Sequence, residues 1–133
     1  MIKTHIAILV SGRGSNMQRL VETCEKNLPS VQIVLVASNK PCAGIEFAAA
    51  RGLPTALIDR QNYDSRQAQE TALAKAIELA AADWIFLAGY MAVLSADFIG
   101  RFAGQILNIH PSILPAFKGL DTQQRALDAG VSQ

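Results

Sequence analysis

The sequence has few residues that bind metal ions or form disulfides. Of its 133 residues, two are cysteine and two are histidine. Cys24 and Cys42 belong to no CxxC motif and to no Cys/His cluster, so their spacing does not match that of a metal site. We therefore expect two reduced thiols in a cytoplasmic protein, and no metal.

The chain also lacks a large excess of charge and any long apolar run. Twelve basic and eleven acidic residues leave a formal net charge of +1. Such a balance gives no global field to draw a protein onto nucleic acid or anionic lipid, so a small-molecule ligand is favoured. The apolar run at residues 6–10 is far shorter than a membrane span of about 20 residues. We expect neither a nucleic-acid partner nor a membrane partner.

What the sequence does have is an alternation of short apolar runs with amphipathic segments, separated by turn residues. We expect strands at residues 5–10, 31–37, 55–58, 84–88 and 105–109, and helices from residue 15 and at residues 43–51, 64–81 and 96–102. Two helix starts match the capping-box pattern, one with Ser15 and Gln18 and the other with Asp64 and Gln67.

This alternation predicts an α/β fold. Continuous apolar strands joined by helices indicate a mostly parallel, Rossmann-like sheet with helices on both faces. A chain that is 50% hydrophobic and shows no repeat or linker is expected to form a single domain over residues 1–133. Ligands of such sheets bind at the carboxyl ends of the strands, so the functional residues should lie in the strand-to-helix loops.

The first of these loops is rich in glycine. Residues 11–16, Ser-Gly-Arg-Gly-Ser-Asn, stand between a strand and a helix, where backbone N–H groups and the helix end can face an anion. A dinucleotide-binding loop would have a third glycine where Met17 stands, and the Gly-Lys-Ser/Thr of a Walker loop is absent. The loop therefore favours one phosphate on a small metabolite. An ordinary tight turn is the alternative, and Arg13 is either an anion contact or a solvated side chain.

A second candidate site lies near the last expected strand. Asn108 and His110 stand two residues apart, so alternation along a strand puts them on one face, and Pro111 favours an extended His110. An Asn amide and a protonated imidazole can both donate to an oxygen that becomes negative when a carbonyl is attacked. The histidine can also carry a proton. A structural histidine that bonds to the backbone remains the alternative.

Together, four motifs give the chain a specific resemblance. Besides the glycine loop, they are Asp64-Ser-Arg66, Leu87-Ala-Gly-Tyr-Met91 and Asn108-Ile-His-Pro-Ser-Ile-Leu-Pro115 followed by Gly119-Leu120. In order and spacing the chain resembles the glycinamide ribonucleotide formyltransferases along essentially its whole length. That resemblance implies formyl transfer from 10-formyltetrahydrofolate to the amine of glycinamide ribonucleotide, a step of purine biosynthesis, without a metal or redox cofactor.

The resemblance also implies roles for individual residues. It assigns the substrate phosphate to Gly14, Ser15 and Asn16, catalysis to Asn108 and His110, and folate binding to Arg66, Met91, Ala92, Val93, Leu94 and Asn108. For Met91, Val93 and Leu94, plain core packing is the alternative.

Two neighbouring branches of the family are less similar. Formyltetrahydrofolate hydrolases resemble residues 115–119, but they usually have a second histidine where Pro111 stands and carry an extra amino-terminal domain. Methionyl-tRNA formyltransferases resemble the histidine segment but lack the glycine loop. The ribonucleotide branch is therefore favoured.

Family members continue beyond Val131 into a segment that contains the aspartate partner of the catalytic histidine. We therefore interpret the chain as truncated at its carboxyl terminus, so that this piece alone is expected to be weak or inactive. The alternatives are a catalytically inactive phosphate- or folate-binding fragment and a related hydrolase. The resemblance leaves a homodimer open.

Overall fold

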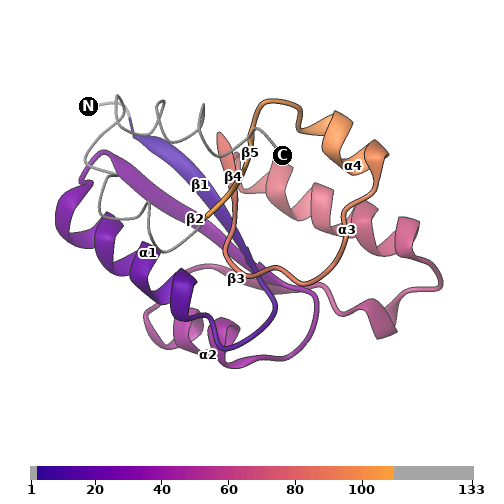
Figure 1. Cartoon of the computed structure of the whole chain (residues 1–133), viewed down its shortest axis with the longest axis horizontal. Helices are drawn as coiled ribbons and strands as arrows, with labels where there is room; N and C mark the ends of the chain where they lie inside the picture. The colour runs from indigo at the N-terminus through magenta and orange to yellow at the C-terminus, as the bar shows by residue number, and fades with distance from the viewer. Residues whose placement is uncertain (1–2, 110–133) are drawn as a thin grey trace.

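A computed structural model describes residues 3–109, which form a parallel sheet between two layers of helices (Figure 1). The strands are β1 (Thr4–Val10), β2 (Val31–Ser38), β3 (Thr55–Leu57), β4 (Trp84–Leu87) and β5 (Ile106–Asn108). The helices are α1 (Ser15–Asn27), α2 (Ala43–Ala50), α3 (Arg66–Leu79) and α4 (Ala96–Arg101), with a 3-10 turn, η1, at Arg60–Asn62. The predicted α/β class with a parallel sheet is confirmed.

The middle strand of the sheet is β1, and the strand order is β3-β2-β1-β4-β5. Side chains of β1 are buried on both faces because the strand is apolar at every position from Ile6 to Val10. The chain first builds outward from β1 to β2 and β3, and then α3 carries it back across the sheet to β4 on the other side of β1. The order therefore reverses between β1 and β4.

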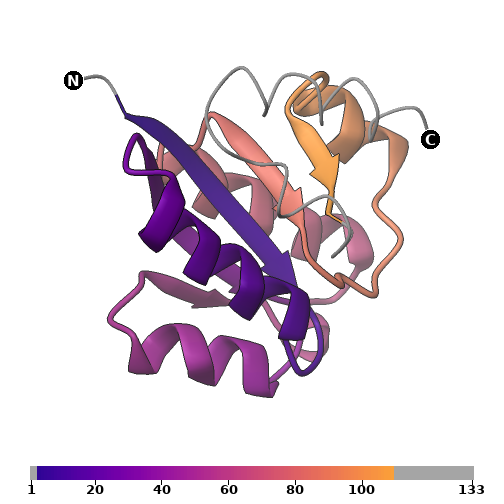
Figure 2. The ribbon, with the colours of Figure 1, turned by 60° about the vertical axis from the view of Figure 1, so that its left-hand side comes forward.

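Each face of the sheet has its own hydrophobic core. On one face Ile6 and Ile8 pack with Met17 and Leu20 of α1, and α2 covers the same face. On the other face Leu9 packs with residues of α3 and α4. Figure 2 shows α1 in front of the sheet and α3 and α4 behind it. Each fully buried side chain of this size contributes about 1.5 to 3 kcal/mol to the stability of the fold.

Every predicted strand and helix is present within two residues of its expected ends. The capping boxes, however, are wrong. The N-cap of α1 is Gly14, whose φ of 76° makes a left-handed entry, so Ser15 already lies inside the first turn and no side chain caps the helix. At α3 the cap lies one residue later than predicted, because Ser65 Oγ accepts the hydrogen bond from Ala68 N at 3.0 Å.

The 3-10 turn η1 was not predicted from the sequence. It forms because the Asp59 side chain accepts a hydrogen bond from Gln61 N at 3.0 Å, which supports a single tight turn after β3. Between residues 3 and 109 no helix is long and apolar enough to cross a membrane.

Candidate active site

The carboxyl ends of β1 and β4 lie side by side. Leu9 pairs with Leu87, and Ala88 N donates a hydrogen bond to Leu9 O at 2.9 Å. The chain leaves the two strands in opposite directions, toward α1 and toward α4. In open α/β sheets this reversal point is where ligands bind, since the two loops diverge and leave a crevice. The predicted glycine loop and the predicted folate segment are the two loops at this point.

The glycine loop packs tightly against the start of α2. Gly14 has a φ of 76°, which is unfavourable for residues other than glycine, and a Cβ at this position would lie 2.7 Å from the Cα of Gly44. Gly44 N donates to Gly12 O at 3.1 Å. The shape of the loop therefore depends on glycine at position 14, for its backbone angle as well as for the space it leaves.

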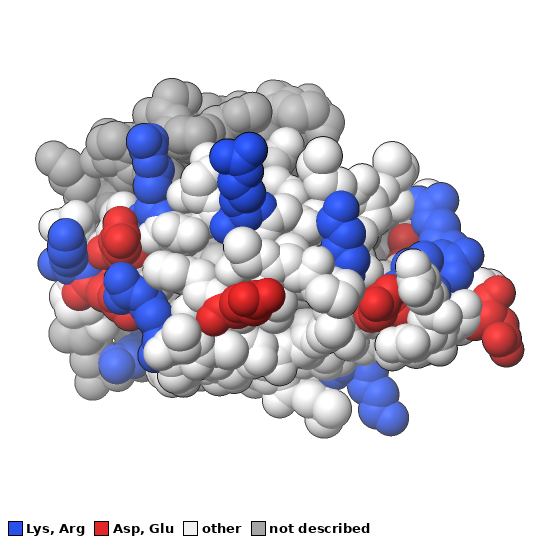
Figure 3. Space-filling view, turned by 90° about the horizontal axis from the view of Figure 1, so that it is seen from below, with Lys and Arg blue, Asp and Glu red and all other residues white. Residues whose placement is uncertain are grey.

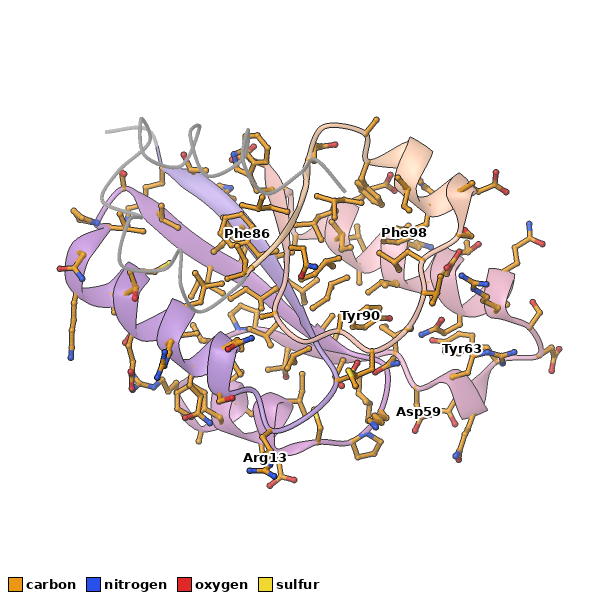
Figure 4. The ribbon with its side chains drawn as sticks, viewed as in Figure 1. Arg13, Asp59, Tyr63, Phe86, Tyr90 and Phe98 are labelled. Carbon is orange, nitrogen blue, oxygen red and sulfur yellow. The ribbon has the colours of Figure 1, made fainter. Side chains whose placement is uncertain are left out.

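The three residues predicted to hold a phosphate lie together at the amino end of α1. Gly14 is buried, Asn16 is half-buried and Ser15 is exposed. The first turn of α1 contains no acidic residue and no side chain caps it, so its backbone N–H groups face outward without a competing side-chain acceptor. Arg13 is exposed at the outer end of the loop (Figure 4). This arrangement suits an anion.

Beside this loop, the segment between β4 and α4 lines a pocket of about 290 Å³. Ala92, Val93 and Leu94 contribute to its wall, together with Asn39, Arg60, Arg66, Gln69, Glu70 and Tyr90. Core packing, the alternative for this segment, is wrong for the two most exposed residues, because Met91 and Val93 are 76% and 79% exposed. Leu94 is half-buried and packs against the core on the α3 face.

Met91 differs from the three residues that follow it. Its side chain is not part of the pocket wall in the structure, whereas its backbone N donates a hydrogen bond of 2.7 Å to Ser11 Oγ. The contact joins the loop after β4 to the first residue of the loop after β1. Met91 therefore fixes the position of the segment through its backbone, and its exposed side chain is left free to contact a ligand.

Arg66, the first residue of α3, anchors the same segment. Its Nη2 donates to Val93 O, and its Nε lies 3.5 Å from Glu70 Oε2. The Glu70 carboxylate accepts hydrogen bonds from Ser95 N, at 2.9 Å, and from Ser95 Oγ. The side chain of Glu70 is only 10% exposed, so its charge depends on these partners. Arg66 and Glu70 together fix the end of the segment that leads into α4.

Tyr90 lines the same pocket and lies between the sheet and α3 (Figure 4). Burial raises the pKa of its hydroxyl, the charge of Glu70 raises it further, and a hydrogen bond with Gln69 partly opposes the shift. The hydroxyl is therefore protonated at neutral pH and can donate a hydrogen bond to a polar ligand in the pocket.

Asn108 is the last residue of β5, and it is exposed. It pairs with Leu87, so it stands at the same edge of the sheet as the two loops. Its predicted partner His110 lies outside the described residues, as does the rest of the Pro-Ser-Ile-Leu-Pro segment. The structure therefore places one of the two predicted catalytic side chains at the site.

The charged side chains around this end of the molecule are mixed in sign. Figure 3 shows basic and acidic residues interspersed rather than gathered in one patch. Within the described part of the chain, no group of three or more His, Cys, Asp or Glu residues could hold a metal ion. The described face therefore offers a ligand specific contacts at the two loops, and it does not offer a broad electrostatic field of one sign.

Five residues that line the pocket had been given no role from the sequence: Asn39, Arg60, Gln69, Glu70 and Tyr90. Asn39 could have been found, because it is a polar residue directly after β2, at the carboxyl edge of the sheet. Glu70 could not, because a glutamate in the middle of a helix is usually solvent-exposed and nothing local shows that it faces Ser95.

Comparison with known proteins shows what the chain as a whole is similar to. Residues 4–133 match the family described as formyl transferase. A phosphoribosylglycinamide formyltransferase of Haemophilus influenzae is 42% identical over 126 residues, which are 94% of this chain and 59% of that protein. The trifunctional purine biosynthetic protein adenosine-3 of Bos taurus is 41% identical over 98% of this chain, which corresponds to 13% of that protein.

Solved structures agree with the sequence matches. The crystal structure of a phosphoribosylglycinamide formyltransferase from Brucella melitensis superposes with a TM-score of 0.77 and 43% identity. The match covers 96% of this chain and 67% of that one. The present chain thus spans about three fifths of the Haemophilus influenzae protein and a much smaller share of the trifunctional one.

Proposed function

Because the chain belongs to the formyl transferase family, we propose that it carries part of the active site of a phosphoribosylglycinamide formyltransferase. The proposed reaction moves the formyl group of 10-formyltetrahydrofolate onto the amine of glycinamide ribonucleotide, in the biosynthesis of purines. The chain spans 59% of its Haemophilus influenzae relative, so the activity is proposed for the complete protein that contains it.

The observation that carries the proposal is the meeting of two unlike sites at one point of the sheet. The amino end of α1, free of acidic residues in its first turn, suits the phosphate of the ribonucleotide. The pocket of about 290 Å³ beside it combines apolar with polar walls, as a folate requires. The hydrogen bond from Met91 N to Ser11 Oγ joins these two sites.

On the acceptor side, we assign the phosphate to Gly14, Ser15 and Asn16. The backbone N–H groups of the first helical turn would bind the phosphate oxygens, with the half-buried Asn16 side chain beside them. Binding at this end directs the rest of the substrate along the carboxyl edge of the sheet, toward β4 and β5.

On the donor side, we assign the folate to Arg66, Met91, Ala92, Val93, Leu94 and Asn108. Arg66 holds the wall of the pocket in place. Its half-exposed guanidinium also offers a positive charge at the rim of the pocket. The exposed side chains of Met91 and Val93 provide apolar surface that a flat aromatic ring would cover.

Catalysis is direct attack of the substrate amine on the formyl carbon. The carbonyl oxygen becomes an oxyanion in the tetrahedral intermediate, and the amide of Asn108 with a protonated His110 would stabilise it. The proton released by the amine passes to the departing nitrogen, and tetrahydrofolate leaves as the formyl–nitrogen bond breaks. A preorganised donor of this kind contributes about 3 kcal/mol to the step.

The proposal includes a cytoplasmic location and small-molecule partners. Cys24 and Cys42 are both unpaired thiols, which suits a reducing compartment. Both proposed substrates are small molecules, in agreement with a site built from loops and one pocket rather than from a broad charged surface.

The direct test is formyl transfer by the complete protein, compared with its Asn108→Ala and His110→Ala variants. Each substitution is expected to lower kcat about a hundred-fold or more without unfolding the protein, because each removes an oxyanion donor. Production of formate without a formylated product would assign the protein to the hydrolase branch instead. Binding of both substrates without any turnover would identify an inactive binding protein.

A further inference from the structure

Ser11 has an unusual position among the residues of the site. It follows directly after β1, the middle strand, and its side chain is completely buried. Its Oγ donates a hydrogen bond to Asn39 Oδ1 and accepts one from Met91 N, both at 2.7 Å. One small side chain therefore joins segments that lie 28 residues and 80 residues away in the sequence.

These contacts connect the loops that follow three adjacent strands. Ser11 begins the glycine loop after β1, Asn39 begins the loop after β2, and Met91 lies in the segment after β4. Asn39 also reaches the turn beyond β3, since Arg60 N donates to Asn39 O at 3.3 Å. Both Asn39 and Arg60 line the pocket of about 290 Å³. The glycine loop, which we assign to the ribonucleotide, and the wall of the pocket, which we assign to the folate, thus meet at the hydroxyl of Ser11.

We infer that Ser11 is a positioning residue that sets the distance between the two substrates. This inference rests on the proposed function and deepens it. With the ribonucleotide held by the glycine loop and the folate held by the segment after β4, the Ser11 hydroxyl fixes how far apart the amine and the formyl carbon lie. Ser11 itself touches neither reacting atom.

The reason that such a contact matters is geometric. Two bound reactants react quickly only when the attacking atom is about 3 to 3.5 Å from its target, and a misplacement of about 1 Å can cost a hundred-fold in rate. If the Ser11 hydroxyl is removed, each loop keeps its own backbone contacts, such as that of Gly44 N with Gly12 O. Each ligand can then still bind, but the distance between the ligands is no longer fixed.

The chain offers a matched control in Ser38. This serine ends β2 next to Val10, the residue that precedes Ser11, and it is also buried, with 1% of its surface exposed. Its hydroxyl bonds to the backbone of Lys40 and contacts Cys42 Sγ at 3.3 Å, so these contacts stay within the loop after β2. Ser38→Ala therefore removes a buried hydroxyl of the same kind without separating the two substrate loops.

The experiment is single-turnover formyl transfer by the complete protein, with glycinamide ribonucleotide and 10-formyltetrahydrofolate both saturating. The Ser11→Ala variant is expected to be about ten-fold slower, which corresponds to about 1.4 kcal/mol in the barrier. Its KM for each substrate should stay within about three-fold of the parent value, because each binding loop is intact. Ser38→Ala should lower the Tm about as much as Ser11→Ala does. Its single-turnover rate should nevertheless stay within about two-fold of the parent.

A second measurement tests the route of the effect. Asn39→Ala removes the acceptor of the Ser11 hydroxyl, and the double variant should be no slower than the slower single variant, because both changes break the same contact. A Ser11→Ala rate within two-fold of the parent under saturation would overturn the inference. The inference would also be overturned if Ser38→Ala slowed the reaction as much as Ser11→Ala does. Ser11 would then contribute only to the stability of the fold. A parent protein that transfers no formyl group overturns the proposed function, and the inference with it.

Discussion

A side-chain carbon on Gly14 would lie 2.7 Å from the Cα of Gly44, closer than such atoms approach in folded proteins. The loop after β1 and the first turn of α2 therefore touch through backbone alone. The φ of Gly14, 76°, adds an independent requirement, because a residue with a Cβ is strained there. Position 14 combines a conformational constraint with a steric one, and the two can be separated by experiment.

Gly14→Ala is expected to destabilise the protein by more than the left-handed backbone alone explains. The strain costs about 1 to 2 kcal/mol, and the contact with Gly44 should bring the total above about 2 kcal/mol. Urea unfolding measures the difference. Gly52→Ala is the matched control, because Gly52 has a φ of 78° but nothing within 4 Å of the added carbon. If Gly14→Ala and Gly52→Ala lower the free energy of unfolding equally, the glycine loop moves aside without a steric cost.

Gly44→Ala should affect binding more than stability. The added carbon would meet Val10 Cγ2 at 3.0 Å, Gly12 O at 3.2 Å and Gly14 Cα at 3.3 Å, so the Val10 side chain and the glycine loop must both give way by a few tenths of an ångström. Alanine also favours the helix by about 1 kcal/mol, which offsets part of the steric cost. We expect a KM for glycinamide ribonucleotide raised several-fold and a KM for the folate that stays the same. An unchanged KM for the ribonucleotide would show that the glycine loop does not bind the phosphate.

The fold could be predicted almost entirely because its signals are local. Apolar runs bounded by glycine or polar residues define each strand, and the alternation with helices selects a parallel sheet. The helix caps were harder to predict, because a polar side chain near a helix start caps only if its own backbone lies outside the helix. Ser65 is extended, with a φ of -148°, and caps α3, whereas Ser15 already lies inside α1. Gly14 makes a left-handed entry, and no residue pattern in the sequence specified this.

The site was predicted only in part, and the reason is again physical. Gly14, Ser15 and Asn16 are contiguous, so a single motif is enough to propose them as the phosphate contacts. Contacts such as Ser11 with Met91 join residues 80 positions apart and appear only when the strand order is known. The sequence predicted the segments of the site, and the structure supplied the side chains that connect them.

Glu70 is expected to be essential for the donor pocket, because its buried carboxylate holds the segment that leads into α4. Its carboxylate accepts from both Ser95 N and Ser95 Oγ and pairs with Arg66, which in turn holds Val93 O. Glu70→Ala removes the acceptor and should destabilise the protein by about 2 to 3 kcal/mol, because buried donors lose a charged partner. The KM for 10-formyltetrahydrofolate should rise about ten-fold or more as the segment loosens, since this corresponds to about 1.4 kcal/mol.

A second ion pair on the same helix serves as the control for Glu70. Glu78 also lies on α3, and it pairs with Arg101 of α4 at 2.8 Å, but both side chains are nearly half-exposed. Glu78→Ala should therefore cost at most about 1 kcal/mol and leave both KM values unchanged. If the two variants raise the folate KM equally, the contact between α3 and α4 matters in general, and the Glu70 carboxylate has no special role.

Cys24 should make stability depend on pH in alkaline solution. Burial within the core raises the pKa of its thiol from 9.0 to about 12, and the neighbouring Glu25 adds to the shift. Between these two values the unfolded chain loses the thiol proton while the folded protein keeps it, so deprotonation favours unfolding. The contribution of the Cys24 thiol to stability is fully present below pH 9 and falls as the pH rises toward 12, at up to about 1.4 kcal/mol per pH unit.

Urea unfolding from pH 8.5 upward should show a shallower decline in the free energy of unfolding for Cys24→Ala than for the parent protein. A Cys42→Ala control keeps the buried thiol and should retain the parent slope, so equal slopes for all three proteins would show that the Cys24 thiol does not stay protonated in the fold.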